Sequence, residues 1–270
     1  MMKRRDFLAS SIAVSAAGGA PLTSAPAGMS PADDQPAREY YELRRYQLRR
    51  GPQTKVVDDY LREAFIPAMK RLGIGPVGVF NTAIGNDSPL VYVLMACPSL
   101  DLLVTANARL ASDAEDQRAG APLINAPAAA PAYHRVENSL MMAFAGIPKL
   151  EVPPAISGQR SRIFELRIYE SHSKKANRKK IEMFNTGEIA IFRRTGLRPV
   201  FFGETLIGSR FPNLTYMLVF DDLAARERNW ATFIADPGWK KLSGMPEYSD
   251  AEILTNISNV ILNPAPYSEI

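Results

Sequence analysis

The sequence predicts an α+β fold in which two tandem ferredoxin-like modules, each β-α-β-β-α-β, pack sheet against sheet as a barrel within one chain. The first observation behind this prediction is a repeat. YELRRYQL at residues 41–48 and FELRIYES at residues 164–171 share Glu-Leu-Arg-x-Tyr. Subtracting 41 from 164 gives an offset of 123, which also carries Arg71 onto Arg194. A register held over roughly 40 residues predicts two copies of one module.

The second observation is the order of elements expected in each copy. Strands are expected where apolar and polar residues alternate, and helices where apolar residues recur three and four positions apart. In the first copy the expected strands are 40–48, 76–84, 90–96 and 136–145, and the expected helices are 54–72 and 100–117. In the second copy the expected strands are 162–170, 199–206, 214–220 and 251–262, and the expected helices are 174–195 and 223–242.

Local signals justify where these elements begin and end. The first helix carries apolar residues at the required spacing, namely Val57, Leu61, Phe65, Met69 and Leu72. Gly73 follows as a helix stop, and Asn86-Asp87-Ser88-Pro89 predicts the turn between the second and third strands. Ser173 is the expected N-cap of the helix that starts at residue 174.

The N-terminus resembles a twin-arginine export signal. A basic head that includes Arg4 and Arg5 precedes a short apolar stretch, and Arg4-Arg5-Asp6-Phe7-Leu8 matches Arg-Arg-x-Phe-Leu. Ala25-Pro26-Ala27 fits a small-x-small cleavage site, so residues 1–27 are the expected signal peptide and the protein is expected to be periplasmic or secreted. The apolar stretch is shorter than the ~20 residues of a transmembrane helix, so no stable membrane anchor is expected after cleavage. The alternative is an amphipathic N-terminal helix.

The rest of the chain divides at its composition changes. Residues 28–38 are the expected tether, 39–145 the first module, 146–161 a linker rich in proline and glycine, and 162–270 the second module. The net charge of +4 is too modest to indicate a nucleic-acid partner. A single cysteine excludes an intramolecular disulfide, and a homo-oligomer is a possible assembly.

The repeated charged residues share one face of their strands. Phe164, Leu166 and Ile168 point to one side, and the charged and tyrosine residues between them point to the other. We expect the helices to cover the apolar set and the other module to cover the charged set. The candidate ligand-binding residues, all predicted to line the barrel interior, are Glu42, Arg44, Tyr46, Glu165, Arg167 and Tyr169.

These sets support two interpretations. An arginine held by a carboxylate could bind a carboxylate or enolate oxygen, with the tyrosine donating a hydrogen bond. The same residues could instead form an internal ion pair that fixes the barrel register, since unpaired buried charge is costly. Their presence in both copies favours the structural interpretation.

The repeat resembles the NIPSNAP family, within the dimeric α+β barrel superfamily. The resemblance rests on the two Glu-Leu-Arg-x-Tyr stretches, on Thr-x-Ile-Gly at 82–85 and 205–208, and on Asn229-Trp230 with Asp236-Pro237-Gly238-Trp239. The first copy departs from the pattern, because Asp113-Ala114-Glu115 stands where Asp-Pro-x-Trp is expected. The family implies little chemistry. The wider superfamily includes cofactor-free monooxygenases, isomerases, lyases and haem proteins, which share a barrel cleft as the reaction site.

Few other residues carry chemistry. His134 and His172 are candidate haem ligands or general bases, although an exposed loop histidine is the commoner explanation for each. The cysteine and histidines lack zinc-site spacing, so no metal is expected. The leading hypothesis is an exported small-molecule binder, with or without cofactor-independent catalysis and with no cofactor expected. The alternatives are a non-catalytic interaction or scaffold protein and, third, a haem protein.

Overall fold

The computed structural model describes residues 37–85, 89–154 and 162–270. The predicted signal peptide, most of the tether and part of the linker lie outside the described residues. The described residues form one compact unit that holds both modules. No helix in the described ranges is long and apolar enough to cross a bilayer.

The first module has the predicted β-α-β-β-α-β order. Its strands are β1 (Tyr40–Leu48), β2 (Val77–Ile84), β3 (Leu90–Cys97) and β4 (Tyr133–Ala143). The first helical region is α1 (Gln53–Tyr60), a π-helical turn η1 (Leu61–Phe65) and α2 (Ile66–Arg71). The second is α3 (Leu100–Leu110), α4 (Ala114–Ala119) and α5 (Ala121–Ile124).

The second module repeats this order. Its strands are β5 (Ile163–Glu170), β6 (Arg198–Ile207), β7 (Asn213–Phe220) and β8 (Asn256–Pro264). Its first helical region is α6 (Lys174–Met183), a π-helical turn η2 (Phe184–Glu188) and α7 (Ile189–Arg194). Its second is α8 (Leu223–Ala235), α9 (Pro237–Ser243), the 3₁₀ turn η3 (Pro246–Tyr248) and α10 (Asp250–Ile253). The two π-helical turns are related by the offset of 123 residues.

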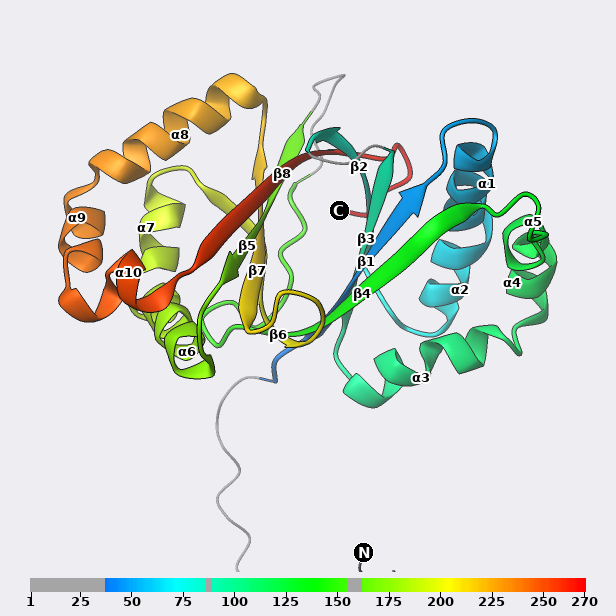
Figure 1. The fold of residues 1–270 in the computed structure, drawn as a ribbon, viewed down its shortest axis with the longest axis horizontal. Coiled ribbons are helices and arrows are strands. Elements are labelled where there is room, and N and C mark those ends of the chain that lie inside the picture. Colours follow the sequence, from blue (N-terminus) through cyan, green and yellow to red (C-terminus); the bar gives the residue numbers. More distant parts are fainter. Residues whose placement is uncertain (1–36, 86–88, 155–161) are drawn as a thin grey trace, which may run out of the picture. The chain divides into compact units, whose positions relative to one another are not determined.

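The eight strands close into one antiparallel barrel in the order β1-β3-β2-β8-β5-β7-β6-β4. Each module supplies four neighbouring strands, and the two sheets join edge to edge where β2 pairs with β8 and β4 pairs with β6. The helices of the first module lie on one flank and those of the second on the other (Figure 1). The predicted fold, two ferredoxin-like modules forming an intrachain barrel, is therefore confirmed.

The predicted helices differ from the observed ones mainly where an aspartate interrupts them. Asp113 caps α4 by accepting hydrogen bonds from the backbone of Glu115 and Asp116, so the helix expected over 100–117 is divided. Asp236 caps α9 in the same way, and Pro237 occupies the first position of that helix, which suits a proline. Ser173 caps α6, as predicted. The strand expected over 251–262 begins later, because its first residues form α10.

Each capping aspartate also binds an arginine from the end of its module's first helical region, Arg71 of α2 or Arg194 of α7. Arg71 reaches Asp113 at 2.8 Å, and Arg194 makes two hydrogen bonds to Asp236, the shorter at 2.5 Å. The Arg194 hydrogen bonds, with the two backbone amides at the helix start, lower the pKa of Asp236 to about 2. The first copy therefore keeps the aspartate and its arginine although it lacks the proline and tryptophan of the motif.

The described part of the linker is fixed to the barrel. The backbone amide of Glu39 donates to the Pro148 carbonyl at 2.8 Å, and the Leu150 amide donates to the Glu39 carboxylate at 2.7 Å. The Glu151 amide then donates to the carbonyl of Val200 in β6. Residues 146–154 thus connect the start of β1 to the second module's sheet.

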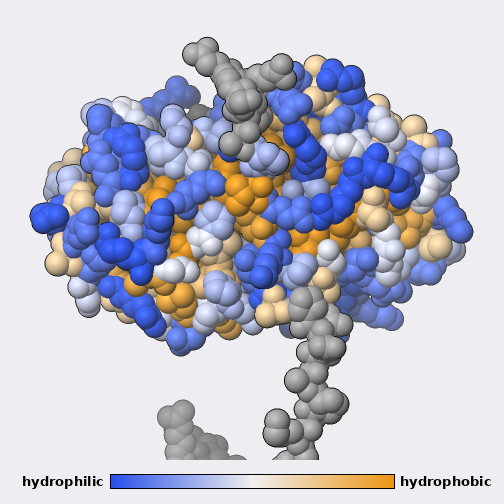
Figure 2. All heavy atoms as spheres, turned by 180° about the vertical axis from the view of Figure 1, so that it is seen from behind, coloured by the Kyte–Doolittle hydropathy of each residue, from blue (hydrophilic) through white to orange (hydrophobic). Residues whose placement is uncertain are grey.

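Buried apolar residues form one layer inside the barrel and one beneath each set of helices. The middle of the interior is filled by large side chains, namely Tyr41, Phe80, Met141, Phe164, Phe201 and Met217. A Cβ atom at Gly78 would lie 2.6 Å from the Phe80 ring, so only glycine leaves room for that ring. Seen from behind, hydrophobic residues gather in the central part of the face and hydrophilic residues surround them (Figure 2).

The charged sets lie on the opposite sheet face from the predicted one. Leu43 and Leu166 face the interior, whereas Tyr46 and Tyr169 pack beneath the helices. The prediction that Glu42, Arg44, Tyr46, Glu165, Arg167 and Tyr169 line the barrel interior is therefore wrong. The reason is that β1 and β5 are buried on both faces. The alternation of polar and apolar residues assigns them to opposite faces of the sheet, but it does not show which face the helices cover.

Candidate functional site

A hollow of about 150 Å³ opens at one end of the barrel. Its apolar wall is Leu43, Leu90, Tyr92, Leu166, Ile168 and Val260. These residues come from β1, β3, β5 and β8, so both modules build it. An apolar cavity of about this volume holds one aromatic ring. The hollow can therefore receive a small, largely apolar molecule or part of one.

Polar side chains surround the opening of the hollow. They are Arg45, Glu137, Ser139, Ser209, Arg210 and Ser258. Asn259 also borders the hollow, but its side chain donates to Glu165 on the other face of the sheet. Arg45 and Glu137 are opposite each other on the neighbouring antiparallel strands β1 and β4, and their side chains pair at 2.5 Å. Arg210 donates a hydrogen bond to the Ser258 hydroxyl at 2.9 Å. An apolar wall with a few polar groups at its opening is the usual composition of a small-molecule site.

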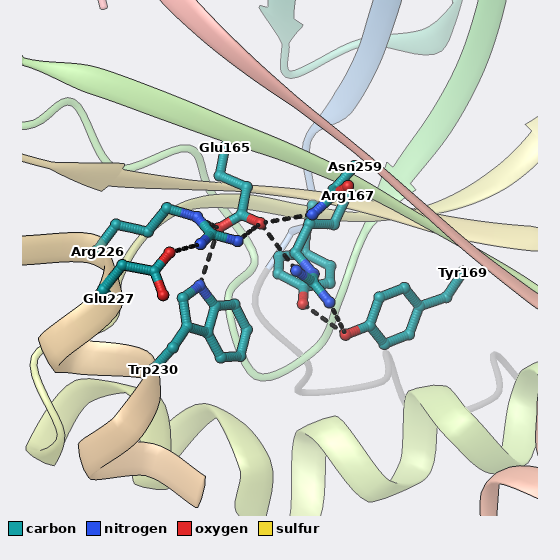
Figure 3. Close-up of polar contacts among 8 residues, drawn as sticks. Glu165, Arg167, Tyr169, Arg226, Glu227, Trp230 and Asn259 are labelled. Carbon is teal, nitrogen blue, oxygen red and sulfur yellow. Dashed lines mark hydrogen bonds and ion pairs between the residues drawn. The ribbon is translucent and has the colours of Figure 1, made fainter. Parts of the chain in front are cut away.

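The charged set of the second copy forms a buried network between the sheet and α8. Glu165 is fully buried and accepts two hydrogen bonds from Arg226, one from Trp230 and one from Asn259 (Figure 3). Arg167 pairs with the same carboxylate at 2.8 Å. Burial alone would raise the pKa of Glu165, but the Arg226 hydrogen bonds and the Arg167 charge outweigh it and lower that pKa. This carboxylate is ionised and fully engaged.

The network continues to two tyrosines. Arg167 donates to the Tyr169 hydroxyl at 3.3 Å, and that hydroxyl lies 2.8 Å from the hydroxyl of Tyr216. Arg167 also lies over the Trp230 ring, 4.6 Å from its centroid. Burial raises the pKa of Tyr216 well above its usual value, so this hydroxyl is neutral. These contacts favour the structural interpretation of the set.

The first copy has a simpler version of this network. Arg44 makes two hydrogen bonds to Glu42, at 2.6 and 3.2 Å, and one to Asn107 of α3 at 3.0 Å. The Arg44 guanidinium lies 5.0 Å from the centroid of the Phe65 ring. The two copies therefore share the Glu-Arg pair but anchor it to the helices with different residues.

Sequence reasoning missed a second buried ion pair. Lys180 and Glu188 pair at 2.8 Å, and each is about 2% exposed or less. The Lys180 ammonium also lies over the rings of Tyr169, Phe184 and Trp239. The offset of 123 places Val57 and Phe65 of the first copy at these positions. A charged residue where the other copy is apolar was the signal available in the sequence.

The sequence model of the NIPSNAP family matches residues 41–127 and 164–269, which cover both modules and most of the chain. The chain belongs to the NIPSNAP family.

Among solved structures, those of other NIPSNAP proteins align with about one module of this NIPSNAP chain. An uncharacterised NIPSNAP-like domain protein from Burkholderia xenovorans is 27% identical, with a TM-score of 0.37, covering 42% of this chain and 92% of its own. A NIPSNAP family protein of unknown function from Agrobacterium tumefaciens is 20% identical, with a TM-score of 0.37. The alignment covers 42% of this chain and 96% of the Agrobacterium protein. No curated protein matches the chain significantly.

A structure that spans both modules is more distant in sequence. A candidate monooxygenase from Fusobacterium nucleatum subsp. nucleatum is 7% identical, with a TM-score of 0.53, covering 84% of this chain and 93% of its own. At this identity the likeness concerns the fold alone. It supports the barrel of two modules and carries no reaction over to this NIPSNAP chain.

The two histidines lie apart from the hollow. His134 is exposed on β4, where a loop was predicted, and His172 is exposed just before α6. His172 borders an open groove with Lys175, Lys179 and Glu252, and neither histidine belongs to the hollow's wall or opening. Among the described residues, no group of three His, Cys, Asp or Glu side chains is arranged to hold a metal ion.

Proposed function

We propose that this NIPSNAP protein is exported and binds a small, largely apolar molecule in the hollow at the end of its barrel. The observation that carries the proposal is the hollow itself, because the rest of the interior is filled by large aromatic and methionine side chains. Both modules contribute to its wall, so the site needs the whole chain. The proposed ligand-binding residues are therefore Leu43, Leu166, Arg45 and Arg210, which border the hollow, in place of the Glu-Arg-Tyr sets.

Cofactor-independent catalysis in this hollow would have two groups able to carry a proton. Glu137 stands at the opening, and Tyr92 lies in the wall. A carboxylate and a phenol can act as base and acid when they lie within hydrogen-bond reach of a substrate. The binding proposal stands without a reaction, and the identity of the bound molecule would decide whether one occurs.

Filling the hollow is expected to abolish binding. Ile168 lies in the wall and is partly exposed, so Ile168→Trp should occupy the space with little effect on the core. Native mass spectrometry of protein purified from its own host should show a retained small-molecule mass for the wild type and none for the variant. Toluene in saturation-transfer NMR should likewise bind only the wild type. We expect at least a tenfold loss of affinity, equivalent to about 1.4 kcal/mol.

A neighbouring position gives the matched control. Ile257 lies one residue before Ser258 on β8, is 42% exposed and does not border the hollow. Ile257→Trp should therefore leave toluene binding unchanged. If the wild type binds neither a retained molecule nor toluene, or if both variants bind as the wild type does, the proposal is wrong.

Export is tested separately from binding. The twin-arginine route recognises the arginine pair, so Arg4→Lys combined with Arg5→Lys should stop processing and leave the full-length chain in the cytoplasm. Cell fractionation and intact-mass measurement would follow the loss of residues 1–27. A substitution of Lys3 by glutamine should reduce processing far less. Unchanged processing in the double variant would contradict twin-arginine export.

An interaction role is the second candidate. Large apolar side chains are exposed at strand ends and in the β6–β7 loop, namely Ile84, Ile207, Phe211 and Ile257. Exposed apolar residues that gather together mark surfaces for partners more often than isolated ones do. If Ile207→Glu abolished association with a protein partner while toluene binding persisted, the interaction role would be additional to the binding role.

A further inference from the structure

The opening of the hollow has an excess of positive charge. Of the charged residues that border it, Arg45 and Arg210 are cations and Glu137 is the one anion, within the part of the chain that the structure describes. Glu137 is already engaged, at 2.5 Å by Arg45 and at 3.5 Å by Arg135. A second cation at this opening would meet repulsion, and an anion would meet attraction.

Arg210 differs from Arg45 in its partners. Its guanidinium donates to the neutral Ser258 hydroxyl at 2.9 Å. It also forms a long ion pair with Glu170, at 3.8 Å from one guanidinium nitrogen, and that carboxylate accepts a shorter hydrogen bond from Asn256 at 2.8 Å. A guanidinium has five N–H donors in a planar fork that suits a carboxylate. Arg210 therefore retains donors for an anionic group at the opening.

The loop that carries Arg210 is held by buried residues. The Asn213 side chain donates to the backbone carbonyls of Ser209 and Arg210, each at 3.0 Å, and accepts from the Thr205 hydroxyl at 2.6 Å. Asn213 and Thr205 are both buried. Arg210 has a φ of +60°, which a residue other than glycine keeps only when its surroundings impose it. The arginine is thus positioned at the opening by the fold.

We propose that the ligand of the hollow is a small hydrophobic carboxylic acid. Its apolar part lies against Leu43 and Leu166, and Arg210 receives its carboxylate. This inference rests on the proposed binding function and adds the chemical class of the ligand. Asn213 acts as a positioning residue, because it holds the loop and does not itself border the hollow.

Three one-ring probes of different charge test the ligand class at pH 7. Toluene is neutral, benzoate is an anion and benzylamine is a cation. Wild-type protein should bind benzoate most tightly, toluene less tightly and benzylamine least, as measured by saturation-transfer NMR with competition. Arg210→Gln should weaken benzoate binding about tenfold relative to toluene binding, since a charge-assisted hydrogen bond to the carboxylate is lost.

Two further variants make the result specific. Arg210→Lys keeps the charge and should retain part of the preference for benzoate. Arg198→Gln is the control, because Arg198 has a similar exposure but pairs with Asp221 and borders a different groove. It should leave all three affinities unchanged. A thermal melt would confirm that each variant is folded.

The outcomes separate this inference from the proposed function. If toluene binds as well as benzoate and Arg210→Gln changes neither, the acid inference is overturned and the binding function stands. If benzoate binding survives Ile168→Trp, benzoate binds elsewhere and the inference is also overturned. If no probe binds the wild type, the binding function fails and the inference fails with it.

Discussion

Lys180→Met is expected to destabilise the protein by about 3–5 kcal/mol at neutral pH, because it leaves a buried carboxylate without its cation. Lys180 and Glu188 pair at 2.8 Å, and neither side chain has more than 2% of its surface exposed. Methionine keeps the length of the lysine stem and its contacts with the surrounding rings. The measurement is the free energy of unfolding in urea at pH 7.5.

A double variant separates the lost pair from any packing defect. Replacing both partners, as Lys180→Met with Glu188→Leu, removes both charges, and such replacements are often neutral or stabilising by about 1–4 kcal/mol. The first copy shows that this fold accepts apolar residues here, since Val57 and Phe65 occupy the corresponding positions. If the double variant were as unstable as the single one, packing and not charge would explain the loss.

The defect of Lys180→Met should also depend on pH. Burial raises the pKa of Glu188, and losing Lys180 removes the nearby charge that opposes this effect. A group whose folded pKa lies above its unfolded value contributes stability that is present at low pH and is lost as pH rises through the folded pKa. The deficit of the single variant should therefore shrink between pH 7.5 and pH 5. The double variant should show no such recovery.

Most of the fold could be predicted because its signals are local or repeated. Polar and apolar residues alternate in β1 and β5, which predicts a strand in each place. The spacing of apolar residues in the first helical regions predicts a helix in the same local way. The offset of 123 residues then requires two modules of the same plan, and a sheet with helices on one face must be covered on the other. Asp113 and Asp236 show the limit of this reasoning, since helix breaks at caps depend on a few atoms.

Which face of each strand packs beneath the helices could not be predicted from the sequence. Both faces are buried, so neither can be recognised by its exposure to solvent. Alternation normally distinguishes a core face from a solvent face, but β3 and β7 are buried along their full length. The polar layer of Glu165 and Arg167 could be assigned to either side on sequence alone. Its place beneath α8 follows from Arg226 and Trp230, which lie more than 60 residues away in sequence.

The hollow could not be predicted from the sequence either. Its wall combines side chains from strands of both modules, and its cation depends on the conformation of the loop that Asn213 holds. No spacing in the chain reports such an arrangement. The Lys180–Glu188 pair, in contrast, was visible once the copies were aligned, because a lysine stands where the first copy has Val57. This difference between the copies was the available signal for the buried pair.

Glu165→Gln is expected to cost about 3 kcal/mol at neutral pH, because Arg167 and Arg226 lose the anion that both contact. The glutamine amide would also point donors at the donors that now surround the carboxylate. Glu42→Gln is the matched control in the first copy. Glu42 accepts from Arg44 alone among the described hydrogen bonds, and Arg44 keeps Asn107 and the Phe65 ring. Glu42→Gln should therefore lower the free energy of unfolding by clearly less than Glu165→Gln does. Equal losses of stability in the two variants would contradict a special role for the Glu165 network.

The pH dependence of Glu165→Gln provides an independent measurement. Burial acts to raise the pKa of Glu165, but Arg226, Arg167 and Trp230 together lower it below its ordinary value. Such a group contributes stability that is present above its unfolded pKa of about 4.3 and is lost as pH falls through the folded value. The wild type should therefore lose stability faster than Glu165→Gln below about pH 4, and the gap between them should narrow. If the free energies of unfolding of the wild type and of Glu165→Gln changed in parallel from pH 7 to pH 3, the Glu165 carboxylate would not stabilise the fold through its charge.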